Sequence, residues 1–402
     1  MKKIKVAFVK YGGLTTGGSE KLLQILAANL PKEEFEVAYF YSDMVPSIGV
    51  VVDTSPTDPF RLKYMQDHNV RCIKFALSKI DLTSPLHTWV DTDFFNVFDE
   101  KEFDIIQTCR AGHKEYPFVR IQKKPIIDII ALSSGVDNQY NIARVLHLCT
   151  WSKNAWGKRG GDVSRARIVS LPISIENVGT TDLRDELNLN AKWVFGMHQR
   201  NSGDIFSPIP LESYAKIEND TTAFILLGGG QAYRDQAVEL GLKHVYFLPP
   251  TGDSDRIFSF LRTLTVYAHG RKDGEVNSQA IAEAMYYGLP IVSHISAINN
   301  GHIECIGDAG VVVLTVKEYS DELKKLMENK NYFHYRKDES YKRFKEHYEL
   351  EGQIKKYVEI YKDIYHNPFP NKVRRFLMSI HYTQNIRIVL VWIYLKLKMV
   401  RV

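Results

Sequence analysis

Short apolar segments rich in β-branched residues alternate with helical patterns over residues 1–170. The first apolar segment is 4–9, and the spacing of Leu22 and Leu26 within residues 20–30 places leucines on one face of a helix. The other expected strands of this half are 36–42, 103–108, 125–132, 144–150 and 166–172. Strands separated by helices predict βαβ units and therefore a parallel sheet.

A second series of the same kind follows a polar stretch at 174–190, which contains little that could form a core. Its expected strands are 192–198, 222–230, 244–250, 264–270, 289–294 and 309–314. Residues 317–365 are rich in charge and helical, without a further strand. The pattern predicts two doubly wound α/β domains in tandem, with ligands bound at the carboxyl ends of the strands, in the cleft between the domains.

These patterns divide the chain into five parts. A chain of 402 residues is long enough for two or three domains with cores of their own, without disulfide or metal staples. The expected parts are an N-terminal domain at 1–173, a linker at 174–190, a C-terminal domain at 191–340, closing helices at 341–366 that pack back towards the N-terminal domain, and a basic amphipathic tail at 367–402.

Composition and charge exclude several classes of protein. Hydrophobic residues make up 45% and charged residues 25%, which excludes a disordered chain, a fibre and a polytopic membrane protein. The net charge of +5 has its source in residues 371–402, which contain seven basic and no acidic residues, so that residues 1–370 carry −2. A nearly neutral body argues against nucleic acid as a partner.

The basic tail is the one part with a strong electrostatic preference. Residues 376–400 combine aromatic and aliphatic side chains with interspersed cations, and their charge-free stretches are shorter than the roughly 20 apolar residues of a membrane-spanning helix. Two interpretations stay open. Residues 371–402 either lie on an anionic membrane surface as a basic amphipathic segment, or form a terminal helix that packs on the body with its cations in solvent.

Cysteine spacing and the N-terminal sequence bear on the location of the protein. The four cysteines, Cys72, Cys109, Cys149 and Cys305, lie far apart without CxxC spacing, so we expect reduced, mostly buried thiols. The apolar core before Lys10 is four residues long, too short for a signal peptide. The protein is predicted to be cytoplasmic, and peripheral at the inner face of a membrane if the tail binds lipid.

A glycine-rich loop, YGGLTTGGSE at residues 11–20, joins the first expected strand to the first helix. Glycines such as Gly17 and Gly18 allow backbone amides to approach an anion, and the N-terminus of the helix adds a favourable dipole. A flexible strand-to-helix turn without a ligand is the alternative interpretation. The GxGxxG pattern is absent, which argues against an NAD enzyme.

Two glutamates lie eight residues apart in the sequence GEVNSQAIAEAMYYGLP at residues 274–290. An expected strand ends just before this sequence, and Asn277 or Ser278 can cap a helix that runs to about residue 287. Glu275 then lies in the loop at the carboxyl end of the strand, and Glu283 about a turn and a half into the helix. Such spacing also arises by chance, so the context of a capped helix end aimed at the cleft makes it a candidate site.

This block resembles the E-x7-E signature of retaining glycosyltransferases with the GT-B fold, specifically glycosyltransferase family 4. The GGSE loop at 17–20 is similar to the GG-x-E loop of that family, and residues 194–200 resemble its strand that ends in a phosphate-binding arginine. The resemblance covers about residues 1–365. It implies two Rossmann-like domains facing across a cleft, the first on the acceptor side and the second binding a nucleotide sugar.

The resemblance also implies roles for single residues. Glu275 would face the donor sugar and stabilise positive charge on it, while Glu283 would bind the ribose hydroxyls. Arg200 would neutralise the leaving diphosphate as charge develops. The other implied donor-binding residues are Gly17, Gly18, Val276, Asn277, Ser278, Gln279 and, at the end of the strand beside the base, Leu248. Enzymes with this fold generally act without a bound divalent metal, so no metal site and no cofactor besides the donor are expected.

Two departures from the family pattern matter. The lysine usually found five residues after the phosphate arginine is replaced by Ile205, and Arg271 or Lys272 are the candidate substitutes for its charge. A histidine frequent in the first domain is replaced by Ser133 or Ser134. His113 is the candidate on the acceptor side, and a loop histidine without a role is the alternative.

The sequence therefore predicts a hexosyltransferase-type enzyme that moves a sugar, with retention and without metal, from a nucleotide-diphosphate sugar to a glycan, a lipid-linked saccharide or another hydroxyl. Two alternatives stay open. A degenerate GT-B protein would bind nucleotide or glycan without turnover, and a sugar-nucleotide epimerase would act without an acceptor.

Overall fold

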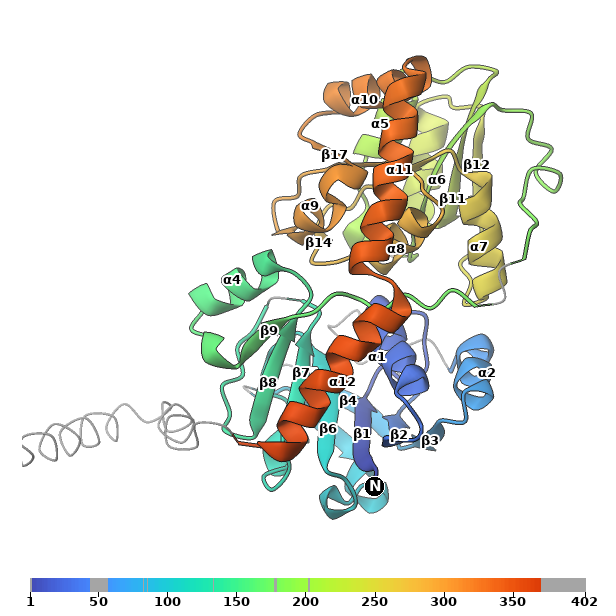
Figure 1. The fold of residues 1–402 in the computed structure, drawn as a ribbon. Helices are drawn as coiled ribbons and strands as arrows, with labels where there is room; N and C mark the ends of the chain where they lie inside the picture. Colours follow the sequence, from blue (N-terminus) through green and yellow to red (C-terminus); the bar gives the residue numbers. More distant parts are fainter. Residues whose placement is uncertain are drawn as a thin grey trace, which may run out of the picture.

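The computed structural model describes residues 2–43 and 57–369, apart from Leu82, Pro85, Ser133, Asn177, Val178 and Ser202. The described chain forms two α/β domains, one above the other in Figure 1, with the C-terminal helices crossing from the second domain to the first. The predicted tail at 371–402 lies outside the described residues. Within the described ranges, none of the helices is long and apolar enough to cross a membrane.

The N-terminal domain is built on one seven-stranded parallel sheet. In spatial order its strands are β3 (Arg71–Lys74), β2 (Phe35–Tyr41), β1 (Ile4–Lys10), β6 (Ile105–Arg110), β7 (Ile126–Ile130), β8 (Ile142–His147) and β9 (Ala166–Ile168). The predicted strands are all present, and β3 is an additional one. Because the strand order reverses between β1 and β6, the carboxyl ends of these two strands flank a crevice.

The two faces of this sheet are covered differently. Successive residues of β1 alternate between two apolar clusters, one on each face. One face packs against α1 (Gly18–Asn29) and α12 (Leu350–His366), the other under the hairpin of β4 (Leu77–Asp81) and β5 (Thr88–Thr92). Beneath this hairpin lies an aromatic cluster of Phe40, Phe75, Trp89, Phe94, Phe98, Phe103 and Phe118. The hairpin, which the sequence pattern did not predict, closes this side of the sheet.

The C-terminal domain contains a six-stranded parallel sheet. Its strands, in spatial order, are β12 (Val245–Leu248), β11 (Thr222–Gly228), β10 (Trp193–Gln199), β13 (Val266–Ala268), β15 (Ile291–His294) and β17 (Gly310–Val313), each of them at a predicted position. The order reverses between β10 and β13. A separate short pair, β14 (Gly274–Glu275) and β16 (Asn299–Asn300), lies next to the cleft.

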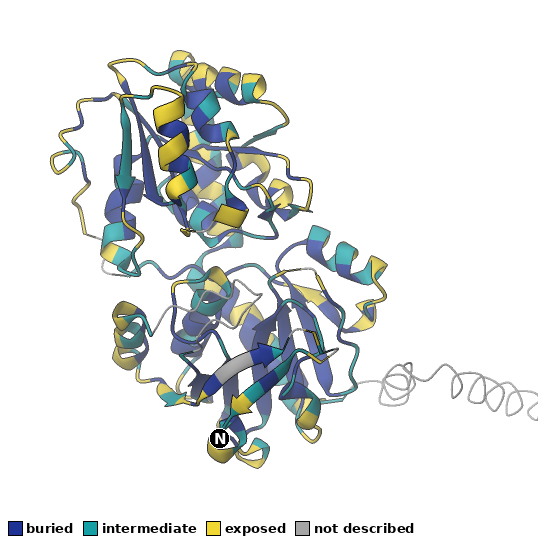
Figure 2. Ribbon diagram, turned by 180° about the vertical axis from the view of Figure 1, so that it is seen from behind, coloured by how far each residue is buried: buried dark blue, intermediate teal, exposed yellow. Residues whose placement is uncertain are grey.

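The helices follow the strands in the expected alternation. Those of the first domain, besides α1 and α12, are α2 (Pro59–Asp67), α3 (Phe94–Val97) and α4 (Thr150–Lys158). Those of the second domain are α5 (Ile209–Tyr214), α6 (Gln231–Glu239), α7 (Ser254–Thr263), α8 (Gln279–Tyr286), α9 (Gly301–Ile306), α10 (Val316–Glu328) and α11 (Lys330–His347). Every residue of β6, β7, β8 and β11 is buried, and exposure is concentrated on the outer helices and loops (Figure 2).

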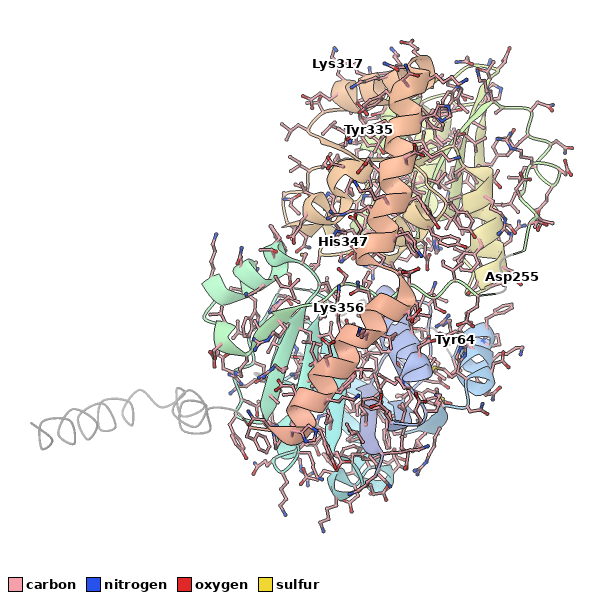
Figure 3. The ribbon with its side chains drawn as sticks, in the orientation of Figure 1. Tyr64, Asp255, Lys317, Tyr335, His347 and Lys356 are labelled. Carbon is pink, nitrogen blue, oxygen red and sulfur yellow. The ribbon has the colours of Figure 1, made fainter. Side chains whose placement is uncertain are left out.

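The last two helices belong to different domains. In Figure 3, His347 marks the end of α11 on the second domain and Lys356 lies on α12 along the first. The Tyr361 hydroxyl on α12 donates to Oε1 of Gln107 in β6 at 2.9 Å, and both groups are buried. The predicted boundary at 340/341 falls inside α11, and the helix that packs back on the first domain begins at Leu350.

The chain passes between the domains twice, and the two passages lie side by side. On the first passage, the amide of Ile173 donates to the carbonyl oxygen of Tyr348 on the second passage at 3.0 Å. Ile173 and Glu349 also form an isolated parallel bridge. The two covalent connections between the domains are therefore fastened to each other at one place.

Candidate functional site

A cleft of about 690 Å³ lies between the two domains. Its walls include residues that directly follow the four strands at the reversal points: Tyr11 after β1, Ala111 after β6, Arg200 after β10 and His269 after β13. Open parallel sheets bind ligands at such reversal points. The fold therefore predicts that a ligand binds in this cleft.

The glycine loop forms the N-terminal domain's side of the cleft, and Glu20 shapes it. Gly17 is the N-cap of α1, and this residue provides no side-chain cap for the first amides of the helix. The Glu20 carboxylate turns back beneath the loop, where it accepts from the Ser19 hydroxyl at 2.8 Å and pairs with Lys10 Nζ at 3.2 Å. A Cβ on Gly12 or Gly17 would collide with that carboxylate. The space beside these two glycines is thus filled by the Glu20 carboxylate.

The start of α8 forms the opposite wall. Ser278 caps the helix by accepting from the Ile281 amide at 3.5 Å. The buried side-chain oxygen of Asn277 and both polar side-chain atoms of Gln279 have no hydrogen-bond partner among the described residues. Both residues line the cleft. Since buried polar groups are almost always paired, these atoms indicate a polar ligand at the start of α8.

Glu275 lies at the end of β14 with cationic and neutral donors around it. Arg271 holds Asp273 through two bonds of 2.8 and 2.6 Å and reaches Oε1 of Glu275 at 3.2 Å, while His269 Nε2 is 3.9 Å from the same oxygen. Burial alone would raise the pKa of Glu275, but Arg271 and His269 hold it below its usual value. Burial lowers the pKa of His269 to about 4. At neutral pH the site thus presents a carboxylate beside a neutral imidazole.

Glu283 is paired across the cleft. Its Oε1 is 2.5 Å from the Nζ of Lys21 in the first turn of α1, and the Glu283 side chain is only 2% exposed. The two loops that the sequence singled out therefore face one another, joined directly by an ion pair between α1 and α8. The ribose position implied by the resemblance is occupied here by the Lys21 ammonium.

The predicted phosphate arginine, Arg200, is more exposed to solvent than Glu275 and Glu283. Arg200 is 41% exposed and pairs with Asp204 at 3.2 Å. Ile205, at the position of the missing lysine, is buried at the cleft wall, and its carbonyl oxygen accepts from the Lys272 amide at 3.2 Å. Of the two substitutes for its charge, Arg271 lines the cleft, whereas Lys272 is not among the cleft-lining residues of the described chain.

The acceptor side contains His113 and a buried carboxyl group that the sequence did not single out. His113 accepts from or donates to the Ser134 hydroxyl at 3.1 Å, and its ring lies 4.4 Å from that of His87. Ser133 lies outside the described residues. Glu115, also in the cleft wall, accepts from the Trp89 indole at 2.7 Å, and burial raises its pKa to about 7.

Most of the predicted site residues come together in this cleft. Those that line it are Gly17, Gly18, His113, Arg200, Glu275, Asn277, Ser278, Gln279 and Glu283. Val276 and Leu248 are buried and are not among its described lining residues. Lys21, Glu115 and His269 are cleft residues that the sequence argument missed, although His269 directly follows a predicted strand end. Among the described residues, no group of three or more His, Cys, Asp or Glu could hold a metal ion.

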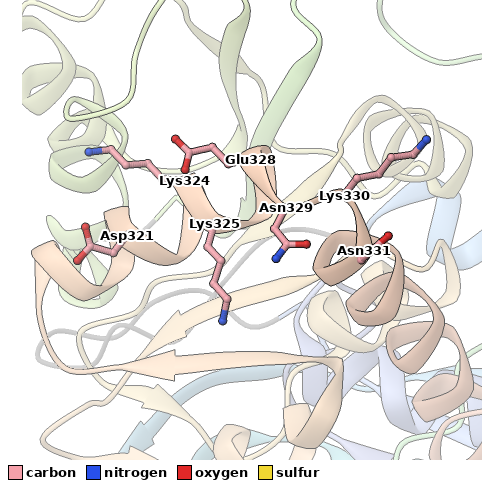
Figure 4. A pocket seen from close by; sticks show the side chains of 7 residues that line it. All are labelled: Asp321, Lys324, Lys325, Glu328, Asn329, Lys330 and Asn331. Carbon is pink, nitrogen blue, oxygen red and sulfur yellow. The ribbon is translucent and has the colours of Figure 1, made fainter.

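A second hollow, of about 550 Å³, lies at the corner between α10 and α11 (Figure 4), and none of its lining residues is also a lining residue of the cleft. Its seven lining residues are all exposed, and the side chains of Lys324 and Lys330 point away from each other. It presents no convergent buried polar groups, so it is a surface depression rather than a ligand site.

Two facing parallel sheets with a cleft between their carboxyl ends and a C-terminal helix that returns to the first domain define the GT-B fold. The chain superposes on Anabaena HepE in complex with UDP and glucose with a TM-score of 0.69 at 17% identity, covering 90% of this chain and 100% of HepE. For sucrose-phosphate synthase from Thermosynechococcus elongatus the TM-score is 0.66 at 13% identity, with 91% and 100% covered. For the glycosyltransferase WaaG it is 0.60 at 13% identity, with 88% and 99% covered.

These likenesses establish the GT-B fold. No protein-family model and no curated protein sequence matches the chain. The assignment of a reaction therefore depends on the chemistry of the cleft.

Proposed function

We propose that this protein is a retaining glycosyltransferase that moves a sugar from a UDP-sugar to a hydroxyl acceptor without a metal ion. One observation carries the proposal. Glu275 and Glu283 flank the start of α8 in the same cleft wall where Asn277 and Gln279 present buried polar atoms without partners. The glycine loop at the start of α1 faces them, linked through Lys21 and Glu283.

The charges of the cleft fit the requirements of glycosyl transfer. Departure of the diphosphate leaves an oxocarbenium-like sugar, which a nearby carboxylate stabilises. Glu275 is kept ionised by Arg271 and can supply that carboxylate. The amides at the starts of α1 and α8, together with Arg200, would hold the leaving diphosphate.

Binding of the nucleotide would rearrange one ion pair. For Glu283 to accept the ribose hydroxyls, Lys21 must leave its carboxylate. Lys21 belongs to the first turn of α1, beside the amides proposed to hold the diphosphate, so its ammonium would turn towards the phosphates. In this way Lys21 would replace part of the charge that Ile205 does not supply.

The choice of UDP rests on the fold relatives. HepE, which superposes over 90% of this chain, has been solved in complex with UDP-glucose. The acceptor would enter along the first domain, beside His113 and Glu115, and would be a glycan, a lipid-linked saccharide or a similar alcohol. Peripheral attachment to an anionic membrane through residues 371–402 would suit a lipid-linked acceptor.

One observation favours a second candidate, a GT-B protein that binds nucleotide without turnover. Two arginines that line the cleft are already paired with carboxylates, Arg271 with Asp273 and Glu275, and Arg200 with Asp204. If these pairs persist with a ligand bound, the diphosphate is a poor leaving group.

Ligand binding and turnover, measured separately, test both candidates. Thermal unfolding is recorded with UDP, GDP, ADP, CDP and dTDP in the presence of a chelator, since a ligand of the folded state raises the unfolding temperature. Release of UDP from UDP-hexoses is then measured, with and without acceptor glycans. We expect UDP to stabilise the protein, and UDP release to require no metal.

Two matched variants assign the glutamates. Glu283→Gln should lose the UDP-induced shift, whereas Glu275→Gln should keep it and lose about 100-fold or more in turnover. Glu328→Gln, on the exposed α10–α11 corner, is the control and should match the wild type. Unchanged turnover in Glu275→Gln contradicts the site assignment. Binding without turnover in the wild type favours the second candidate, and an epimerised sugar nucleotide formed without acceptor identifies an epimerase.

A further inference from the structure

The two domains also meet where α4 of the first domain abuts α9 of the second. Glu304 on α9 accepts hydrogen bonds from the first two amides of α4, those of Thr150 at 3.0 Å and Trp151 at 3.1 Å. The Asn277 side chain donates to the carbonyl oxygen of Leu148 at 3.0 Å. These contacts join residues 148–151 to α9 and to the loop that follows Glu275.

Two cysteines from different domains come together at this contact. Cys149 donates to the carbonyl oxygen of Val276 at 3.2 Å, and the Cys305 sulfur lies 3.8 Å from the same oxygen. The two thiols therefore lie against the same carbonyl oxygen. Both thiols are free and buried, and Val276 directly follows Glu275 in the chain.

The two thiols have different surroundings. Cys149 is the N-cap of α4, and its sulfur accepts from the Ser152 amide at 3.4 Å. The interaction between the two thiols lowers the pKa of Cys149 below that of an ordinary thiol and raises the pKa of Cys305. The thiolate is the nucleophile in thiol chemistry, so Cys149 is the attacking sulfur and Cys305 the resolving one.

We propose that Cys149 and Cys305 form a peroxide-responsive pair that closes to a disulfide between the two domains. The Cys149 thiolate attacks one oxygen of a hydroperoxide, the O–O bond breaks, and an alcohol or water leaves after taking up a proton. The product is a sulfenic acid on Cys149. The Cys305 thiol then attacks that sulfur, the S–O bond breaks, water leaves, and the S–S bond forms. One hydroperoxide is reduced by two electrons, and the two thiols are oxidised.

The position of Cys149 and Cys305 at the domain contact determines what a disulfide between them would do. Cys149 and Cys305 are buried at the domain contact, so an oxidant reaches them when the contact opens, and the disulfide forms when it closes again. The bond would prevent the domains from separating at this edge and would hold the Val276 carbonyl beside it. Under the proposed function, donor and product could then no longer exchange. The disulfide itself does not depend on that function.

Oxidation of the full-length protein tests the pair directly. After treatment with hydrogen peroxide, free thiols are counted under denaturing conditions with a chromogenic disulfide reagent, and tryptic peptides are analysed by mass spectrometry. We expect the count to fall from four to two per chain, since the chain has four cysteines. Peptides 145–153 and 273–317 should be recovered as one species that dithiothreitol separates.

Serine variants separate this pair from the other cysteines. Cys149→Ser and Cys305→Ser should abolish the linked species, whereas Cys72→Ser, at a half-buried cysteine of the first domain, should keep it. Thermal unfolding of the reduced proteins checks that each variant folds. A linked species is also expected to unfold at a higher temperature than the reduced wild type.

Three results overturn the proposal, and each is distinct from failure of the proposed transferase activity. The first is four free thiols, or irreversibly oxidised cysteines, in the peroxide-treated wild type. The second is a disulfide that involves Cys72 or Cys109. The third is a linked species that persists in Cys305→Ser.

Discussion

At the scale of single residues, two cations of the cleft are paired with carboxylates before a ligand arrives. Arg271 is shared between Asp273 and Glu275, and Lys21 is bound to Glu283. An incoming diphosphate that binds Arg271 or Lys21 must therefore displace a carboxylate from it. Such an exchange favours ligands that compensate both sides, with phosphates for the cations and hydroxyls for the released carboxylate, as a nucleotide does.

Glu115 provides a test of cleft electrostatics that needs no ligand. Burial raises its pKa from 4.5 to about 7, so between these values the unfolded chain releases this proton more readily than the folded one. The free energy of unfolding therefore falls as pH rises from about 4.5 to 7, by up to about 3 kcal/mol. Glu115→Gln keeps an oxygen for the Trp89 indole and removes the titration.

The variant should match the wild type near pH 4.5 and exceed it by about 1–3 kcal/mol above pH 7. Urea unfolding at about pH 5 and about pH 8 measures the difference between the two proteins, so that other titrating groups cancel. Glu328→Gln at the exposed surface serves as the control, with no pH-dependent difference. An identical pH dependence in Glu115→Gln and wild type would show that Glu115 is ionised in the folded state.

The sequence could predict those cleft residues that act through their own chain neighbours. Glu275, Gln279 and Glu283 share one loop and helix, and their positions follow from a strand end and a cap. Lys21 could not be found in this way, because its partner lies 262 residues further along the chain. Glu115 was missed for a similar reason, since its hydrogen-bond partner Trp89 lies 26 residues earlier in the chain.

At the scale of elements, the glycine loop offers a matched pair of substitutions. Gly17 has φ −58°, which alanine adopts freely, but a Cβ there would meet the Glu20 carboxylate. Nothing lies within 4 Å of a Cβ on the adjacent Gly18. Gly17→Ala is expected to cost about 1–3 kcal/mol of stability through this collision, and Gly18→Ala to be tolerated.

Denaturant unfolding of both variants measures the difference, and the nucleotide-induced shift reports whether the loop keeps its shape. Equal stability of Gly17→Ala and Gly18→Ala contradicts the assigned role of Glu20.

The apolar pattern of each strand decides whether it could be predicted from the sequence. Strands of a parallel sheet covered on both faces contain nearly continuous apolar residues, and this pattern located both sheets. The hairpin of β4 and β5 has the sequences LSKID and TWVDT, with few apolar residues in each strand. Its Ile80 and Trp89 are buried by aromatic residues from other segments, which no local pattern contains.

At the scale of the whole molecule, the tail gives a prediction that rests on the sequence alone. Residues 371–402 contain seven basic residues and no acidic one, and each basic residue near an anionic surface contributes about 1 kcal/mol. The full-length chain should sediment with anionic vesicles at low salt and be released at high salt.

A chain that ends at residue 370 should remain in the supernatant, and neutral vesicles should bind neither protein. Equal sedimentation of the long and short chains contradicts membrane attachment through the tail. In that case the alternative, a terminal helix packed on the body, becomes the preferred interpretation.

The return of α12 to the first domain has a consequence for how the protein can be divided. A cut near residue 180, in the exposed part of the first passage, leaves one fragment with the seven-stranded sheet and another with the helix that covers it. Tyr357, Tyr361 and Ile364 are buried against the first domain. Each separated fragment would therefore expose the apolar face that the other fragment covers in the intact protein. The architecture therefore suits fragment complementation, in which two separately produced fragments associate and recover one folded molecule.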